Sequence, residues 1–409
     1  MIKLLYLTGM FPFDQNLASG IFVIKRIENI ISIYSDYISL DSVALVSLYS
    51  RILSKINNKL PEITIKKARY NFIDYLSYRL DVIDYFYKIF FKGISYLRVS
   101  HNFYVLLKEK YNLNSYDIIH SHFVQLGGFV ANEIYRNFHI PYIVTVHGSD
   151  MHVNPYKDTI TKIYTLKVLE EASKVIFVSN YLLNNAKKIG YSGRNAVIIP
   201  NGVDINIFKP LDKDYCRFKL NKYGKYRENN YIIGYVGNLN VIKGAHYLPK
   251  IFKNINDKIK NVQFLIVGDG ELRDYLIKKG KEYKLEIIFA GRVSQEELKF
   301  LYNAMDVLIV PSLKEGFSCV ILEAQACGVP AVGSNVGGIP EAIGGSEYGR
   351  VVELDTNFEE KFAENVVEIL YNKPVALKLI ERAKNLSWEN IVGREIEVYK
   401  EVYKNVIYK

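Results

Sequence analysis

The chain has few cysteines, and they lie far apart. Its 409 residues include three, Cys216, Cys319 and Cys327, and none belongs to a CxxC or CxxH pair. Disulfide-held secreted domains carry closely spaced cysteines, and structural zinc sites need paired ligands. The sequence therefore argues against both, and we expect a reducing, cytoplasmic setting.

Long hydrophobic runs are also missing. A membrane-spanning helix needs about 18 or more consecutive apolar residues, and no uncharged run of that length occurs. The first segment, MIKLLYLTGMFPFD, has a short apolar run without a small-residue cleavage site, so it predicts a buried strand rather than a signal peptide. We expect no membrane span, although contact with a membrane surface stays open.

The composition is that of a globular protein. Hydrophobic residues make up 49% and charged residues 23% of the chain, which excludes disorder as its main state. At about 150 residues per domain, the length predicts two or three domains. Short β-rich runs recur, each followed by a polar turn and a helix-like stretch, which is typical of parallel sheets covered by helices. We predict an α/β fold.

The predicted strands form two series. The first covers residues 2–7, 43–48, 117–120, 142–146, 175–178 and 197–199, and the second covers 231–236, 262–267, 286–289, 307–310 and 331–333. We therefore predict two doubly wound, Rossmann-like domains, over 1–205 and 231–385, joined by a polar linker over 206–230. Apolar residues at helical spacing predict a C-terminal helix within 386–409 that packs back on the first domain: Ile391, Ile396, Val398, Val402 and Val406.

The strongest pattern is residues 306–328, DVLIVPSLKEGFSCVILEAQACG. It predicts a strand, a loop with Glu315, and a helix that contains Glu323. The backbone N–H groups of 316–318 lead into the helix start, where unpaired donors and the helix dipole favour a diphosphate. A carboxylate about two turns further on can accept hydrogen bonds from a sugar diol. The segment therefore predicts a site for a nucleoside diphosphate.

In EGFSCVILEAQACGVP, seven residues separate Glu315 from Glu323. This pattern resembles the signature of the retaining glycosyltransferases of the GT-B fold, specifically glycosyltransferase family four. The resemblance implies two Rossmann-like domains that face a central cleft. It also implies that Glu315 contacts the donor sugar ring and Glu323 the ribose hydroxyls. The amides of Gly316, Phe317 and Ser318 are then expected to hold the donor diphosphate.

A second turn, GNLNVIKG, has Lys243 just before Gly244 at a predicted helix start, where an ammonium can supply charge to a diphosphate. The resemblance continues here, but Asn238 stands at the family's usual arginine position. Asparagine donates hydrogen bonds without charge, so Lys243 acts on the diphosphate alone or with Arg292. Arg292 and Val293 correspond to the region where the nucleotide base lies in the family.

In the first half, PYIVTVHGSD places His147 at the carboxyl end of a strand, where open α/β sheets bind ligands. The family has a similar THGSD-like motif, which implies that His147 contacts the donor sugar close to the anomeric carbon. Asp150 is a weaker candidate, for orienting the loop or an acceptor. Ser19 and Gly20 resemble the family's N-terminal glycine loop, which approaches the donor phosphate or the acceptor.

Two further patterns are weaker. His120 and His122 form an HxH pattern without a carboxylate or cysteine at ligand spacing, so we expect structural or acceptor-lining roles. VGDGELRDYL lacks a third glycine, so Gly268 and Gly270 predict a turn rather than a phosphate cradle. The family uses no metal, and the resemblance implies no metal and no cofactor beyond a nucleotide diphosphate sugar as co-substrate.

The resemblance implies hexosyl-type transfer to a hydroxyl acceptor with retention, and the acceptor is expected to be a lipid-linked, polysaccharide or glycolipid precursor. Domain closure is expected to exclude water. An alternative is a nucleotide-sugar 2-epimerase of the same architecture. A binding module without catalysis is disfavoured because His147, Lys243, Glu315 and Glu323 are all present. A Rossmann dehydrogenase is excluded because LTGMFPFDQN lacks GxGxxG.

The net charge of +10 is concentrated in two segments. Residues 51–110 hold 12 Lys or Arg against 5 Asp or Glu, with 12 Phe or Tyr between them, and residues 209–228 hold 7 against 3. A basic and aromatic surface suits anionic lipid headgroups, so one interpretation is that 51–110 contacts the inner face of the cell membrane. The alternative is a solvated basic face with its aromatic residues in the core. Nucleic acid is disfavoured because no binding motif accompanies the charge.

Overall fold

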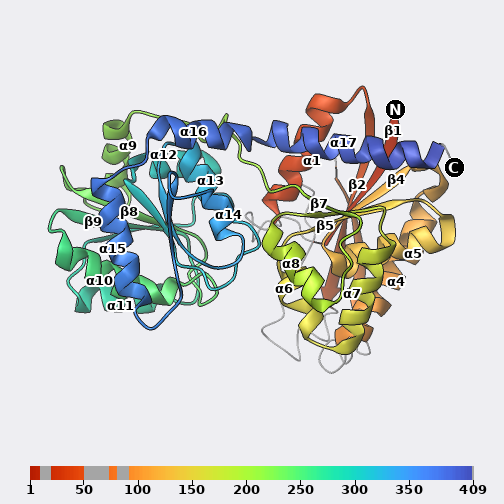
Figure 1. Cartoon of the computed structure of the whole chain (residues 1–409), viewed down its shortest axis with the longest axis horizontal. Coiled ribbons are helices and arrows are strands. Elements are labelled where there is room, and N and C mark those ends of the chain that lie inside the picture. The colour runs from red at the N-terminus through yellow and green to blue at the C-terminus, as the bar shows by residue number, and fades with distance from the viewer. Residues whose placement is uncertain (10–19, 50–72, 81–91, 408–409) are drawn as a thin grey trace. The chain divides into compact units, whose positions relative to one another are not determined.

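The computed structural model describes residues 1–9, 20–49, 73–80 and 92–407. The chain divides into two compact units, with Met1–Pro200 and Ile391–Lys409 in unit 1 and Asn201–Asn390 in unit 2. In each unit, helices cover a sheet of parallel strands (Figure 1). The predicted α/β class is confirmed.

The sheet of unit 1 has seven strands in the order β3-β2-β1-β4-β5-β6-β7. They are β1 (Ile2–Thr8), β2 (Ile38–Tyr49), β3 (Ile73–Leu80), β4 (Ile118–His122), β5 (Tyr142–Val146), β6 (Lys174–Phe177) and β7 (Ala196–Ile198). The sequence did not predict β3, because IDYLSYRL carries charges and lies in the segment interpreted as a basic and aromatic surface. It is an edge strand, where charged residues are common.

Helices and short helical turns link these strands. They are α1 (Ile21–Tyr34), α4 (Lys92–Lys110), η1 (Leu113–Ser115), η2 (Val124–Gly128), α5 (Phe129–Phe138), α6 (Ser149–His152), η3 (Asn154–Tyr156), α7 (Thr159–Glu171) and α8 (Asn180–Ile189). The Asp158 side chain accepts a 2.7 Å hydrogen bond from the backbone N of Thr161, which caps the start of α7. Gly190, with a φ of 115°, ends α8 in the left-handed conformation that glycine tolerates.

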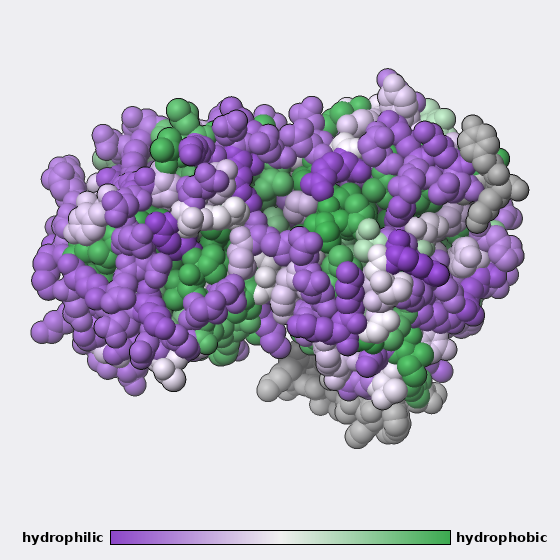
Figure 2. Space-filling model, viewed as in Figure 1, coloured by the Kyte–Doolittle hydropathy of each residue, from purple (hydrophilic) through white to green (hydrophobic). Residues whose placement is uncertain are grey.

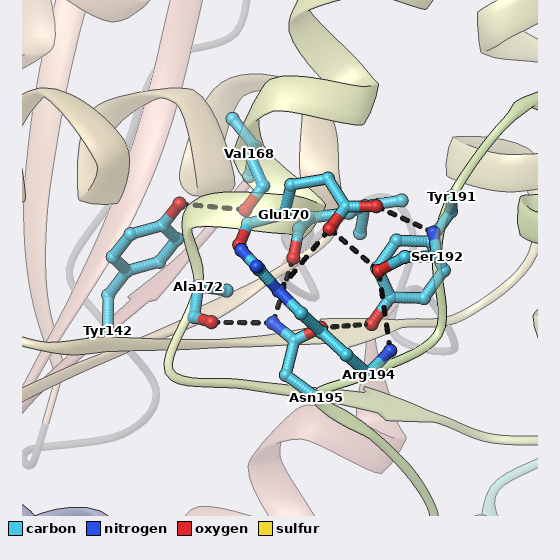
Figure 3. Close-up of polar contacts among 9 residues, drawn as sticks. Tyr142, Val168, Glu170, Ala172, Tyr191, Ser192, Arg194 and Asn195 are labelled. Carbon is cyan, nitrogen blue, oxygen red and sulfur yellow. Dashed lines mark hydrogen bonds and ion pairs between the residues drawn. The ribbon is translucent and has the colours of Figure 1, made fainter.

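A polar network fixes the end of α7 against the loop between α8 and β7 (Figure 3). The Glu170 carboxylate accepts hydrogen bonds from the backbone N and the hydroxyl of Ser192, at 2.6 and 2.8 Å. The Asn195 amide donates to the carbonyl of Leu169 at 2.9 Å. The Tyr142 hydroxyl donates to the carbonyl of Val168 at 2.7 Å. These contacts hold β5, α7 and the loop before β7 as one body within unit 1.

The last helix, α17 (Trp388–Ile407), lies in unit 1 from Ile391 onward. Its apolar face is buried as the spacing predicted for Ile391, Ile396, Val398 and Val402. The same face also carries Glu395, which is fully buried and pairs with the equally buried Arg26 of α1. Removing either partner would leave an uncompensated buried charge, so this pair ties α17 firmly to unit 1.

The sheet of unit 2 has six strands in the order β10-β9-β8-β11-β12-β13. They are β8 (Tyr231–Val236), β9 (Val262–Val267), β10 (Ile287–Gly291), β11 (Val307–Val310), β12 (Ala331–Ser334) and β13 (Gly349–Val352). The helices are α9 (Lys213–Lys219), η4 (Leu220–Lys222), η5 (Ala245–Tyr247), α10 (Leu248–Lys258), α11 (Arg273–Glu282), α12 (Gln295–Ala304), α13 (Cys319–Ala326), α14 (Ile339–Ile343), α15 (Phe358–Tyr371) and α16 (Ala376–Asn385). The sequence did not predict β13, whose four residues give too short an apolar run to recognise.

The expected linker, 206–230, is instead an integral part of unit 2. It contains α9, whose Lys213 and Arg217 bind the buried carboxylate of Asp306 at 2.8 and 2.5 Å. Lys373 adds a third cation at 2.9 Å. Burial alone would raise the pKa of Asp306, but these cations, Lys213 foremost, hold it below its usual value. The polar composition that suggested a linker therefore serves ion pairs inside the unit.

The basic surplus of residues 209–228 is largely neutralised by these contacts. Besides the pairs with Asp306, Lys222 lies 3.1 Å from Glu297 and Arg227 lies 2.7 Å from Glu286. Four of the seven cations in this segment are therefore paired with carboxylates. Much of the other basic segment, including Lys66, Lys67 and Lys88, lies outside the described residues.

Within the described ranges, no helix is both long and apolar enough to cross a membrane. Figure 2 shows a visible face that is mostly hydrophilic, with hydrophobic residues gathered in separate places.

Candidate active site

The winding of the sheet in unit 2 reverses between β8 and its neighbour β11, because β9 and β10 lie on one side of β8 and β11 to β13 on the other. Open α/β sheets bind ligands at such a point, beyond the carboxyl ends of the strands. Lys243 follows β8 and Glu315 follows β11. A backbone hydrogen bond of 2.8 Å from Leu313 N to Ile242 O joins the two loops.

Lys243 and Glu315 meet at this point. The Lys243 ammonium lies 2.6 Å from Oε2 of Glu315, and the two side chains are 34% and 13% exposed. The backbone N of Lys243 donates to Oδ1 of Asn240 at 2.9 Å, which fixes the turn that carries it. The arrangement offers a cation and a carboxylate side by side, which can bind an anionic group and a hydroxyl group respectively.

Three glycines allow the loops to approach this closely. A Cβ at Gly244 would lie 1.8 Å from the carbonyl oxygen of Pro311, and a Cβ at Gly337 would lie 1.9 Å from that of Glu315. The corresponding distance for Gly338 is 2.2 Å, to the carbonyl oxygen of Gly316. Gly244 and Gly337 also have φ angles of 70° and 63°, which favour glycine. The loop after β12 therefore packs directly against the backbone of Glu315 and Gly316.

The start of α13 lies directly after Glu315. Gly316, Phe317 and Ser318 are all buried, and Ser318 precedes the first helical residue without capping it through its side chain. The first N–H groups of a helix lack acceptors within the helix, and the dipole makes this end electropositive. Phosphate oxygens can therefore be bound here without further charges.

Glu323 lies in the second turn of α13. Its Oε2 accepts a 2.7 Å hydrogen bond from the Tyr302 hydroxyl. Burial raises the pKa of Glu323 to about 7, although the hydrogen bond from Tyr302 works in the opposite direction. The carboxyl group therefore changes its charge near neutral pH. Tyr302 is fully buried, so it fixes the position of the carboxylate.

The remaining residues predicted for the donor site lie at the ends of strands of the same sheet. Asn238 is exposed after β8, and its carbonyl accepts a 2.8 Å hydrogen bond from the hydroxyl of Tyr235. Arg292 is exposed and Val293 half-buried, directly after β10. No ion pair or hydrogen bond connects Arg292 to Lys243 or Glu315 in the described part of the chain.

Gly268 and Gly270 shape the loops rather than a phosphate cradle. Their added Cβ atoms would lie 1.9 Å from Gly237 O and 2.5 Å from Leu239 O. Both glycines thus let the loop after β9 pack directly on the loop after β8. This agrees with the turn expected from the sequence.

In unit 1, His147 follows β5 and is 9% exposed. Its Nε2 lies 2.7 Å from Nδ1 of His122, whereas its Nδ1 has no hydrogen-bond partner among the described residues. The rings of Phe22 and Phe123 pack against it, with centroids 4.6 and 4.8 Å away. Burial, together with the charge of Arg26, holds the pKa of His147 well below its usual value, so the ring is neutral.

Asp150 holds the turn that carries His147. Its carboxylate accepts backbone hydrogen bonds from Gly148 at 2.7 Å, from His147 at 3.2 Å and from Val124 at 3.4 Å. Burial raises the pKa of Asp150 to about 6, and the three N–H donors limit that rise. In the HGSD motif, the aspartate side chain therefore accepts hydrogen bonds from the backbone of the same turn.

The HxH pattern forms hydrogen bonds to neighbouring strands and to α17. His120 lies between the hydroxyls of Tyr399 on α17 and Thr145 on β5, at 2.7 and 2.8 Å. His122 lies between Nε2 of His147 and the hydroxyl of Tyr6 on β1, at 2.7 and 2.5 Å. Within the described ranges, no group of three or more His, Cys, Asp or Glu side chains is arranged to hold a metal ion.

Gly20, the other residue predicted in unit 1, is buried at the start of α1 with a φ of 72°, and its carbonyl accepts a 2.9 Å hydrogen bond from Val23 N. Ser19 lies outside the described residues.

Sequence reasoning missed several residues that shape these sites. The pair Gly337 and Gly338 follows a predicted strand after three residues, and a Gly-Gly dipeptide is a recognisable turn signal. Tyr302, Tyr6 and Tyr399 give no such signal, because the chain has 33 tyrosines and only the fold selects these three.

Two family models match the chain. The model described as Glycosyl transferases group 1 matches residues 217–386, and the model described as Glycosyltransferase Family 4 matches residues 70–207. The first match contains Lys243, Glu315 and Glu323, and the second contains His147.

Similar proteins cover most of the chain. An uncharacterized glycosyltransferase of Methanocaldococcus jannaschii is 30% identical over 322 residues, which are 76% of this chain and 82% of that protein. The putative teichuronic acid biosynthesis glycosyltransferase TuaC of Bacillus subtilis is 27% identical over 355 residues, 85% of this chain and 84% of that protein.

Solved structures show a similar fold. Sucrose-phosphate synthase from Thermosynechococcus elongatus has a TM-score of 0.73 at 20% identity, over 99% of this chain and 100% of that chain. The Anabaena protein HepE, solved in complex with UDP-glucose, has a TM-score of 0.68 at 17% identity, over 98% of this chain and 100% of that chain.

Proposed function

Because the chain belongs to the group 1 glycosyltransferases and has the GT-B fold, we propose that it transfers a sugar from a nucleotide diphosphate sugar to a hydroxyl acceptor with retention at the anomeric carbon. The observation that carries this proposal is the pair of Lys243 and Glu315 beside the start of α13, at the reversal of the sheet. The UDP-glucose complex of the structurally similar HepE supports a nucleotide sugar as donor.

The diphosphate is the group that gains charge during transfer. Lys243 supplies a positive charge, and the backbone N–H groups at 316–318 supply hydrogen bonds near the electropositive start of α13. Preorganised donors of this kind stabilise charge that develops in the transition state. Arg292 and Val293 lie after β10, near the edge of the sheet, and we assign them to the nucleotide base. Asn238 adds an uncharged donor at the same strand ends.

Glu315 and Glu323 bind hydroxyl groups. The Glu315 carboxylate, placed by its bond to Lys243, accepts hydrogen bonds from the donor sugar ring. Glu323, held by Tyr302, accepts them from the ribose. His147 of unit 1 is assigned to the sugar close to its anomeric carbon, and Gly20 to the donor phosphate or the acceptor.

The acceptor hydroxyl attacks the anomeric carbon from the face that the diphosphate leaves. A bond forms between the acceptor oxygen and this carbon, the bond from the carbon to the phosphate oxygen breaks, and the acceptor proton passes to the departing diphosphate. No side chain serves as nucleophile in this scheme. Lys243 and the amides of 316–318 neutralise the leaving group, so the transfer is proposed to need no metal and no further cofactor.

The acceptor is proposed to be a lipid-linked, polysaccharide or glycolipid precursor. The name of TuaC places that relative in teichuronic acid biosynthesis, which supports an acceptor of the cell envelope. The excess of seven cations in residues 51–110, together with its aromatic residues, supports contact with an anionic membrane surface.

The proposal is tested with radiolabelled nucleotide sugars and an extract of membrane lipids. We expect transfer of label to an acceptor, with the same anomeric configuration in product and donor, and no loss of rate in excess EDTA. Glu315→Ala and His147→Ala should each abolish most of the transfer. Inversion, dependence on a divalent metal, or release of an altered free nucleotide sugar would contradict it.

Glu364→Ala is the matched control for Glu315→Ala. Glu364 also pairs with a lysine in unit 2, Lys258 at 3.5 Å, but on an exposed helical surface. Exposed pairs contribute little to stability, so this variant should keep its full activity.

A further inference from the structure

A line of buried side chains in unit 1 ends at the ring of His147. Its Nε2 lies 2.7 Å from Nδ1 of His122, and Nε2 of His122 lies 2.5 Å from the hydroxyl of Tyr6. His122 and Tyr6 belong to the neighbouring strands β4 and β1, and both are fully enclosed. The orientation of the His147 ring is therefore set by a histidine that is itself held on its far side.

The line continues to the last helix and back to β5. The hydroxyl of Tyr6 forms a hydrogen bond with that of Tyr399 on α17. The Tyr399 hydroxyl lies 2.7 Å from Nδ1 of His120, and Nε2 of His120 lies 2.8 Å from Oγ1 of Thr145. Five hydrogen bonds thus connect Thr145 to His147 in one line.

Each of the six groups in this line has one proton to donate. The three histidines are neutral, because burial and neighbouring positive charge hold their pKa values well below the usual value. Five bonds use five protons, so one proton is left over. It lies on Nδ1 of His147, on the hydroxyl of Thr145, or on a tyrosine hydroxyl that accepts both of its bonds. In the first case every donor in the line points toward His147.

These positions have different surroundings. Thr145, Tyr6 and Tyr399 are each 0% exposed, and the described residues offer their hydroxyls no partner outside the line, so a leftover proton there is a buried donor without an acceptor. His147 follows the end of β5, where parallel sheets bind ligands, and its Nδ1 has no partner in the described part of the chain. An oxygen of a bound ligand can satisfy a proton there.

We propose that His122 is a positioning residue that donates its Nδ1 proton to Nε2 of His147 and so holds His147 in the tautomer protonated on Nδ1. His147 then donates a hydrogen bond to an oxygen of the donor sugar. The identity of that ligand rests on the proposed function, whereas the tautomer is a property of the protein alone. The sequence assigned His122 only a structural or acceptor-lining role.

The tautomer is measured by two-bond 1H–15N NMR on the full chain with labelled histidine. The chain has seven histidines, and the His147 signals are those lost in His147→Gln. We expect a neutral His147 with its proton on Nδ1. A proton on Nε2, or a charged ring, overturns the proposal. This measurement on the unaltered protein requires no variant to fold.

His122→Phe removes the proton donor and keeps an aromatic ring between His120 and His147, whose centroids lie 4.8 and 4.9 Å from that of His122. We expect His147 to populate both tautomers in this variant; a tautomer that stays entirely on Nδ1 contradicts the proposal. Tyr142→Phe is the control, because it removes a buried hydroxyl that bonds to Val168 outside the line (Figure 3). It should leave the His147 tautomer unchanged, and a change there would also count against the proposal.

Kinetics separate positioning from a general structural role. We expect His122→Phe to lower kcat/KM for the nucleotide sugar about tenfold, as expected for one misplaced hydrogen bond, and His147→Gln to lower it at least as much. The double variant should fall no further than His147→Gln, because His122 acts through His147. Losses that multiply would overturn the proposal. If the unaltered protein transfers no sugar, the proposed function fails while the tautomer result stands.

Discussion

The Lys243 ammonium lies 2.6 Å from Oε2 of Glu315, and this pair joins the loops that follow β8 and β11. The two residues are 72 positions apart in the chain, and a backbone hydrogen bond between the same loops fixes their approach. Because the Lys243 side chain is 34% exposed and Glu315 only 13%, the lysine can turn toward a bound anion more readily than the carboxylate can. Under the proposed function, donor binding therefore divides the lysine's charge between Glu315 and the diphosphate.

Under the proposed function, this division predicts opposite effects of the two partners on nucleotide affinity, for which UDP, the nucleotide in the HepE structures, is the probe. Lys243→Met removes the cation and leaves the Glu315 carboxylate to repel the diphosphate, so UDP should bind about tenfold or more weakly. Glu315→Gln removes the competing anion, so UDP should bind as well as before or a few-fold tighter, while sugar transfer falls at least tenfold. Isothermal titration with UDP and a transfer assay measure the two quantities. Equal losses of UDP affinity in both variants would show that the pair acts only as a structural contact.

The backbone approach of Gly337 to Glu315 gives a second prediction. In Gly337→Ala the added Cβ would lie 1.9 Å from Glu315 O, at a φ of 63°. The loop that carries Glu315 must therefore shift, and we expect a loss of about 2–4 kcal/mol in the free energy of unfolding together with weaker UDP binding. Chemical denaturation and titration with UDP measure both effects.

Gly224→Ala is the control for that variant. Gly224 also belongs to unit 2, but its added Cβ would meet its nearest neighbour, a side-chain atom of Ile288, at 3.5 Å, an ordinary contact. We expect a change in the free energy of unfolding of less than about 1 kcal/mol and unchanged UDP affinity. If both glycine variants behave alike, the close approach at Gly337 has no special role in the donor site.

The raised pKa of Glu323 predicts a pH dependence of nucleotide binding. An ionised carboxylate accepts hydrogen bonds from hydroxyl groups more strongly than a protonated one. With a pKa of about 7, Glu323 gains its charge between pH 6 and pH 8, so UDP affinity should rise by up to about tenfold across that range. Glu323→Gln lacks this titrating group. Any pH dependence of UDP affinity that remains in this variant comes from the ligand and from other residues. Identical pH profiles for the two proteins would contradict a contact between Glu323 and the ribose.

The same pKa fixes the direction of the effect on stability. The folded-state pKa of about 7 exceeds the ordinary glutamate value of 4.5, so the folded protein binds more protons than the unfolded chain between these pH values. The contribution of Glu323 to stability is therefore complete below about pH 4.5 and is lost as the pH rises through 7. The free energy of unfolding should fall less steeply over this window in Glu323→Gln.

The sequence predicted the elements that carry the candidate site but not the contacts between them. Glu315 and Glu323 could be placed on a loop and a helix because strand, glycine and helix signals follow one another within residues 306–328. The bond between Lys243 and Glu315 could not be predicted, since it depends on β8 and β11 being neighbours in the sheet. The roles assigned to all these residues stay predictions.

Long-range burial explains the other differences. The polar segment 206–230 gave the signal of a linker, whereas its cations bind Asp306, whose burial only the fold reveals. No signal in the sequence indicated that Glu395 is buried, but Arg26, from near the other end of the chain, pairs with it in the core. In both cases a charged side chain lies inside because its partner comes from a distant part of the sequence.

The turn that carries His147 gives the last prediction. The Asp150 carboxylate accepts hydrogen bonds from the backbone N–H groups of His147, Gly148 and Val124. Asp150→Ala leaves these groups without an acceptor, and we expect it to lower the free energy of unfolding by about 1–3 kcal/mol and sugar transfer by at least tenfold. The pKa of Asp150 is about 6 in the folded protein, above the ordinary aspartate value of 3.8, so its own contribution to stability declines as the pH rises from about 4 to 6. The variant should lack that decline.

Asp158→Ala separates the effect on the turn from a general loss of stability. Asp158 is also an aspartate of unit 1 that accepts a backbone N–H, that of Thr161 at 2.7 Å, but it caps α7. Loss of this cap should lower the free energy of unfolding by about 1 kcal/mol and leave transfer unchanged at a temperature where both variants are folded. If Asp158→Ala reduced transfer as much as Asp150→Ala, the loss would follow from stability. If only Asp150→Ala loses sugar transfer, activity depends on the conformation of the turn that carries His147.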